Sequence, residues 1–180
     1  EVREMAWMFA GCTKFNQNIG MWDTSNVIRM EGMFEGAVCF NQPLNDWDVS
    51  NVRYMLRMFD GAKSFNQPLD RWNVSRVEDA ERMFKNARSF SQSLDMWLIP
   101  RFCDISNMFL YAPKFTDVKT LTLCFHLATK KNCRARLKEK LDKLHPAEVY
   151  TELSRYGSEH TAEYMRELEA AHPELIGSVR

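Results

Sequence analysis

Residues 47–72 read WDVSNVRYMLRMFDGAKSFNQPLDRW, and this stretch is one unit of a repeat with a period of 25 residues. A shift of 25 positions in either direction returns the same residue types. A Met-Phe pair recurs at 8–9, 33–34, 58–59, 83–84 and 108–109, and Trp recurs at 22, 47, 72 and 97. A fixed period of roughly 20 to 50 residues is typical of a solenoid or an array, so the repeat takes precedence over residue-by-residue assignment.

Within one unit, the spacing of the residues predicts a short helix followed by a short strand. The apolar residues at the spacing of one helix face are Val52, Met55, Met58, Phe59 and Ala62. Ser50 is a candidate N-cap, and Pro68 cannot continue the helix. Trp72 and Val74 alternate as in a strand. The sequence therefore predicts an α/β solenoid in which each turn supplies one short parallel strand and one helix.

A single unit cannot bury its own apolar side chains. About eight of them contribute on the order of 10–20 kcal/mol when buried, whereas ordering 25 residues costs roughly 35 kcal/mol. Neighbouring units must therefore cover each other. Asn16, Asn41 and Asn66 stand in register, each followed by Gln. They are predicted to form a column of amides that satisfies the backbone of a tight turn.

The repeated pattern W-D-V-S-N-V-x-x-M-x-x-M-F-x-x-A-x-x-F-N-Q-x-L resembles the BspA-like leucine-rich repeat surface-protein family. The resemblance covers residues 1 to about 115. It implies a right-handed leucine-rich-repeat-like solenoid, exposure at a cell surface or secretion, and binding to other macromolecules. It carries no catalytic residues over to this chain.

The repeat divides the chain into two predicted domains. Residues 1–115 form the repeat solenoid, with a truncated first copy and a degenerate last copy, and residues 116–180 form an all-helical C-terminal cap or appendage. Helices are predicted at 132–145, 147–156 and 159–171, and either a helix or a strand at 118–129. Because the chain begins inside a unit, we expect a fragment or a processed product.

Composition favours a binding protein over an enzyme. The 24 basic and 24 acidic residues cancel, so the chain as a whole is not built for nucleic acid or an anionic membrane. No run of about 18 apolar residues exists to span a membrane. The five cysteines form no framework, and the four histidines have no partner motif. No catalytic residue, metal site or cofactor is predicted.

Apolar residues that break the repeat pattern are the candidate protein-interaction residues. Trp7 stands where other copies carry Gly or Arg, and we expect either a missing N-terminal segment or a partner to cover it, or packing on its own neighbouring turn. The other candidates are Ile28, Tyr54 and Leu56 on the helical face, and Met96 and Leu98 on the strand face. The alternative is that these are scattered surface residues, which are normal on proteins.

The C-terminal part carries a basic helix. Between residues 130 and 143, seven Lys or Arg stand against two acidic residues. The candidate residues are Lys130, Lys131, Arg134, Arg136, Lys138 and Lys140. Such a helix binds RNA or an acidic protein surface, but without interleaved aromatic residues a solvated charged face is the favoured interpretation.

These patterns predict a non-enzymatic protein–protein interaction scaffold that is a structural subunit of a larger assembly. Its partner is expected at the solenoid faces or at the open N-terminal end. The alternative, which the family resemblance implies, is a cell-surface adhesin that binds a host protein or glycan. The compartment stays open between the cell surface and an intracellular assembly, and a signal peptide on an N-terminal extension would favour the adhesin.

Overall fold

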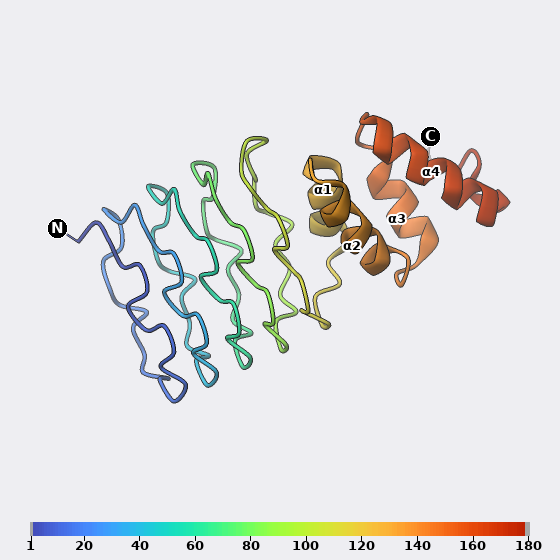
Figure 1. Cartoon of the computed structure of the whole chain (residues 1–180). Coiled ribbons are helices and arrows are strands. Elements are labelled where there is room, and N and C mark those ends of the chain that lie inside the picture. Colours follow the sequence, from blue (N-terminus) through green and yellow to red (C-terminus); the bar gives the residue numbers. More distant parts are fainter. Residues whose placement is uncertain (1, 179–180) are drawn as a thin grey trace. The chain divides into compact units, whose positions relative to one another are not determined.

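The computed structural model describes residues 2–178. The chain forms two compact units, Glu1–Phe115 and Thr116–Arg180. In Figure 1 the first unit, coloured blue to yellow-green, is a stack of similar loops, and the second is helical. We call the successive 25-residue passes of the first unit coils 1 to 5. They are numbered by their Met-Phe pairs, at 8–9, 33–34, 58–59, 83–84 and 108–109.

The coils contain neither the strand nor the helix that the sequence predicts for each unit. The stretch from Leu56 to Gly61 is a run of turns. Among residues 2–115, the only β-structure is a line of isolated parallel bridges, which join Glu4 to Arg29, Arg29 to Tyr54, Tyr54 to Asp79 and Asp79 to Asp104. The predicted α/β class is therefore wrong, and so is the leucine-rich-repeat solenoid of strand-plus-helix units.

The hydrogen bonds of the turns explain why the spacing of the apolar residues predicted a helix. Alternate N–H groups leave the coil: those of Met55, Arg57 and Phe59 donate to carbonyls of coil 4 at 2.8–2.9 Å. The N–H groups between them bond three residues back, as from Met58 to the Met55 carbonyl at 3.1 Å. Buried side chains then recur in steps of three and four residues, which are also the steps of a helix face.

Residues with a positive φ keep these turns from joining into a helix. In coil 3, Arg57 and Gly61 have φ angles of 55° and 74°. Each is the third residue of a hydrogen-bonded turn, where a type II turn requires a positive φ. The equivalent residues of the other coils with positive φ are Trp7, Gly32, Arg82, Asn107, Gly11, Gly36, Asn86 and Tyr111. Glycine adopts this conformation readily, whereas other residues do so at a cost of roughly 1–2 kcal/mol.

Aromatic rings stacked in columns form the core of the first unit. The Phe59 ring lies between Phe34 and Phe84, with centroid distances of 5.5 Å to each. It also stacks on Phe65 of its own coil at 4.1 Å. The Trp72 indole N–H donates to a carbonyl of the preceding coil at 2.9 Å. Neighbouring coils thus supply most of what buries each ring, which is why one coil is not stable alone.

The predicted amide column is confirmed at the turn that follows the second Phe of each coil. The Asn66 backbone N–H donates to Asn41 Oδ1 at 2.9 Å, and Gln67 Nε2 donates to the same oxygen at 3.1 Å. The Asn41 N–H makes the equivalent bond to Asn16 Oδ1 at 2.9 Å. The amides therefore join the coils along a second line, away from the bridges.

The second unit holds all the α-helices of the described chain. They are α1 (Val118–Leu127), α2 (Lys131–Leu141), α3 (Pro146–Leu153) and α4 (Glu159–Ala171), followed by the 3-10 turn η1 (Pro173–Leu175). The Asp117 carboxylate caps α1 by accepting the Thr120 N–H at 3.4 Å. Leu121 and Phe125 are buried at helical spacing, which settles 118–127 as a helix. Within residues 2–178, no helix has the length and apolar character to cross a membrane.

Candidate protein-interaction surface

The outer side of coil 1 exposes apolar side chains that the following coils bury. Val2, Met8 and Trp22 are 51%, 45% and 38% exposed, whereas their counterparts in coils 2 and 3 are at most 3% exposed. The difference arises because coil 1 has a neighbouring coil on one side only. We call this surface the N-face. It consists of the side chains of Val2, Met8, Phe9, Phe15 and Trp22 and the backbone carbonyls of Glu4, Ala6, Met8 and Ala10.

The N-face also leaves backbone acceptors unused. At the boundary between coils 1 and 2, four N–H groups of coil 1 donate to carbonyls of coil 2 at 2.6–2.9 Å. The carbonyls in the equivalent places of coil 1 belong to the N-face, and among the described residues none of them accepts a hydrogen bond. A row of unpaired backbone groups is a template for pairing with another chain.

Trp7 packs on coil 2 and remains half exposed. Its indole fills the space above Gly32, where an added Cβ would lie 2.0 Å from the ring. The side chain is 48% exposed. Trp7 therefore leans onto its neighbouring turn, on the side away from the N-face carbonyls, and only glycine fits beneath it at position 32.

The three candidates from the predicted helical face are each half-buried. They are Ile28, Tyr54 and Leu56. The Tyr54 hydroxyl donates to a Glu78 carboxylate oxygen at 3.2 Å, and the Arg29 guanidinium lies 5.0 Å from the ring centroid. Tyr54 is thus engaged in polar contacts between coils, and the trio offers little free apolar surface.

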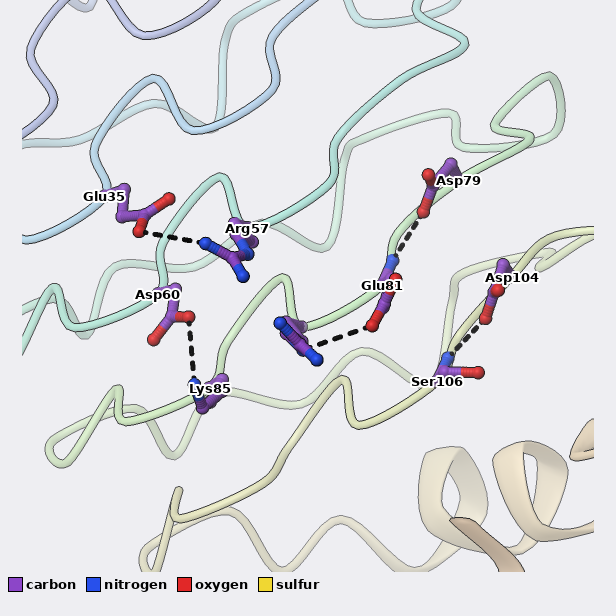
Figure 2. Close-up of polar contacts among 9 residues, drawn as sticks. Glu35, Arg57, Asp60, Asp79, Glu81, Lys85, Asp104 and Ser106 are labelled. Carbon is purple, nitrogen blue, oxygen red and sulfur yellow. Dashed lines mark hydrogen bonds and ion pairs between the residues drawn. The ribbon is translucent and has the colours of Figure 1, made fainter. Parts of the chain in front are cut away.

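Charged side chains on coils 2 to 5 pair with one another. Figure 2 shows Glu35 facing Arg57 and Asp60 facing Lys85, at N–O distances of 3.4 and 3.6 Å. The same view shows the carboxylates of Asp79 and Asp104, which accept the N–H groups of Glu81 and Ser106 at 2.8 Å. Glu81 also pairs with Arg82 at 3.1 Å. The Glu35–Arg57 and Asp60–Lys85 pairs could not be predicted from the sequence, because their partners come from neighbouring coils.

A second exposed apolar group lies at the end of coil 4 and the start of coil 5. Met96 and Leu98, both candidate protein-interaction residues, are 68% and 78% exposed, and Phe102 is 70% exposed. Phe102 points out because the chain slips by one residue: the Cys103 N–H bonds to the Pro100 carbonyl at 3.0 Å, and Cys103 takes the inner place that Val holds in coils 2 to 4.

Comparison with models of protein families identifies the family of this chain. A family model described as "Mycoplasma protein of unknown function, DUF285" matches residues 2–121, which are 120 of the 180 residues. The chain belongs to the DUF285 family. The DUF285 match covers all five coils and ends within α1. No curated protein and no solved structure matches the chain significantly. The resemblance to the BspA-like family stays a prediction.

The predicted basic helix is α2, which lies beyond the DUF285 match. Arg134 donates to two carbonyls that follow α1, at 2.9 and 3.1 Å. Lys138 pairs with Asp142 and Glu167 at 3.2 and 3.0 Å. Burial lowers the pKa of Lys140. The exposed members are Lys130, Lys131 and Arg136. Part of the basic charge of α2 is therefore used in contacts within the second unit.

A small pocket of about 220 Å³ lies between α2 and α4 in the second unit. Its walls include Leu141, Leu144 and Leu168. The polar groups beside it are already bonded: the Tyr164 hydroxyl donates to Asp142 Oδ1 at 2.6 Å, and burial, the largest effect, raises the pKa of this tyrosine. Small-molecule sites are usually larger, at about 300–1,000 Å³, and present free polar groups.

Proposed function

We propose that this DUF285 chain is a non-enzymatic protein-interaction scaffold that binds its partner through the N-face. The observation that carries the proposal is the exposure of Val2, Met8 and Trp22 at the places where later coils are closed. Interface centres are enriched in Trp, Phe and Met. With Phe9 and Phe15 the N-face offers an apolar patch on the order of 300–400 Å², a size that is often functional on a monomer.

The state of the polar groups supports binding over catalysis. An active site brings together a nucleophile, a base or charge-stabilising groups in a pocket. In the described part of the first unit, the charged groups of Figure 2 pair with one another or accept backbone N–H groups. Burial raises the pKa of the Cys103 thiol to about 12, so this cysteine is a poor nucleophile at neutral pH.

A stack of coils joined along several lines is suited to a structural subunit. The bridges, the amide column and the ring columns each connect consecutive coils. Such a stack holds the N-face residues in fixed positions before a partner arrives, and a preorganised surface binds with less loss of conformational entropy.

Site-specific photo-crosslinking in native cells tests the proposal. The full chain carries a photoreactive residue in place of Met8 or, as a matched control, in place of Met96, which is also an exposed methionine. We expect a discrete adduct from position 8 that excess unlabelled chain competes away and that a Trp22→Asp competitor does not. The proposal is wrong if position 8 gives no competed adduct, or if both competitors act equally.

A binding measurement with the cross-linked partner gives the magnitude. Trp22→Ala should weaken binding by about 10- to 30-fold, because truncating an aromatic anchor in an interface usually costs about 1–2 kcal/mol or more. Leu98→Ala, at an exposed apolar residue of coil 4, should leave the affinity unchanged.

A further inference from the structure

We propose that the occupant of the N-face is a coil of the same 25-residue chemistry, carried by a separate protein chain. This inference rests on the proposed function, since it names the partner of the surface assigned there. It follows from the direction of the backbone hydrogen bonds, the register of the side chains and the state of coil 5.

Along the turns, hydrogen bonds of one direction link every pair of coils, whereas outside the turns N–H groups such as those of Ile28 and Cys39 donate to the coil before them. From coil 3 to coil 4, the N–H groups of Met55, Arg57, Phe59 and Gly61 donate to carbonyls 24 residues later at 2.8–2.9 Å. The other three boundaries repeat this set of four bonds, at 2.6–2.9 Å. On the N-face, the four equivalent carbonyls are unpaired among the described residues. The occupant must therefore donate four N–H groups from alternate residues.

The side chains of coil 1 also fit a further coil as the occupant. In later coils the Trp indole N–H donates to a carbonyl 28 residues earlier: Trp47 to Ile19, Trp72 to Leu44 and Trp97 to Leu69, at 2.8–3.1 Å. Among the described residues, Trp22 makes no such bond. Phe9 and Phe15 each stack on a ring of coil 2 at 5.8 and 5.6 Å and are open on the other side. A coil carrying Met-Phe and Phe-Asn in register would complete both columns.

A second copy of this chain does not supply that coil. Two N-faces cannot pair through their four carbonyls, because both sides would present acceptors. Coil 5 of a second copy does not provide open rings to complete the columns, since Phe109 and Phe115 are only 2% and 1% exposed. Coils 2 to 4 are closed on both sides by their neighbours. The fitting occupant is therefore a coil carried by a different protein.

The test extends the full chain by one coil. A duplicate of residues 27–51 placed directly before Val2 keeps the 25-residue register, with Trp47→Phe in the duplicate so that no new indole is added. The matched control carries Met33→Asp and Phe34→Asp in the duplicate, which removes its inward side chains. Both chains have the same length and the same junction.

We expect the intact duplicate to raise Tm by at least about 4 °C relative to the control and to protect Trp22 from acrylamide quenching. Amide exchange at Lys14 and Asn16 should slow at least about tenfold, because their counterparts Cys39 and Asn41 donate to the coil before them. If the intact duplicate and the control behave alike in all three measurements, the inference is overturned.

A second arm identifies the source of the coil. A synthetic peptide of the same 25 residues is added to the full chain, with the Asp-substituted peptide as control. Saturable protection of Trp22 shows that a separate chain can dock. Protection by the fused duplicate alone would overturn the inference, because it would mean that such a coil is held on the N-face only when it is covalently linked. If neither form docks while the position 8 adduct is still competed, the scaffold proposal stands and the inference falls.

Discussion

Replacing Phe59 or Phe9 by Ala compares a closed coil with the open one at equivalent positions. Phe59 is fully buried and has ring neighbours in the coils before and after it. Phe9 is half-buried, and outside its own coil its one ring neighbour among the described residues is Phe34 of the coil after it, at 5.8 Å. Deleting a buried Phe side chain costs about 3–5 kcal/mol, which includes the cavity left behind. We expect about 4 kcal/mol for Phe59→Ala and about 2 kcal/mol for Phe9→Ala, since burial and ring pairing are both reduced there.

Urea unfolding followed by tryptophan fluorescence measures this difference. All five Trp residues, at 7, 22, 47, 72 and 97, lie in the first unit, so the signal reports on the coil stack and not on the helices. With an m-value of about 2 kcal/mol per M, the midpoint should fall by about 2 M for Phe59→Ala and about 1 M for Phe9→Ala. An equal fall for both variants at low protein concentration would refute the argument, because it would mean that coil 1 is closed in solution.

Three further outcomes follow from individual residues. Tyr111→Gly should stabilise the stack by about 1 kcal/mol in the same urea assay, because Tyr111 is 67% exposed and is held at a φ of 58°. The Ser25 hydroxyl, and then the Ser25 N–H, lower the pKa of Asp23 from 3.8 in the folded state. That contribution to stability is present above the ordinary pKa and is lost as the pH falls through the folded value. Acidification from about pH 5 to about pH 2.5 should therefore lower the urea midpoint more for the unmodified chain than for Ser25→Ala. Native thiol titration with an aromatic disulfide should give two fast and three slow cysteines; the fast ones are Cys12 and Cys39, and the slow ones Cys103, Cys124 and Cys133.

The neighbours of the core residues could be predicted from the sequence, but the backbone that carries them could not. Phe34, Phe59 and Phe84 stand 25 residues apart, and identical rings at a fixed period meet whatever path the chain takes between them. The positive φ at Arg57 and Tyr111 could not be predicted from the residue type, because arginine and tyrosine favour negative φ. The signal that the sequence does offer is glycine at 11, 36 and 61, because glycine readily adopts a positive φ.

The N-face could be predicted only in part. Trp7 departs from the repeat, and this departure makes it a candidate protein-interaction residue. Met8 and Trp22 follow the repeat and had the pattern of core residues, and their exposure depends on the absence of a neighbouring coil, which is a tertiary property. The outward position of Phe102 comes from a one-residue slip that moves Cys103 inward, and an alignment by period alone assigns these two residues to the wrong sides.

The bonds between coils also determine how this unit would respond to tension. Each boundary carries its own set of four N–H···O bonds along the turns, and no strand runs through several coils to share the load. A chain pulled from its ends would open the outermost boundary first and then the next. Each released coil adds 25 residues of slack, or about 85 Å at full extension. The stack would therefore lengthen in equal steps at similar force, one coil at a time.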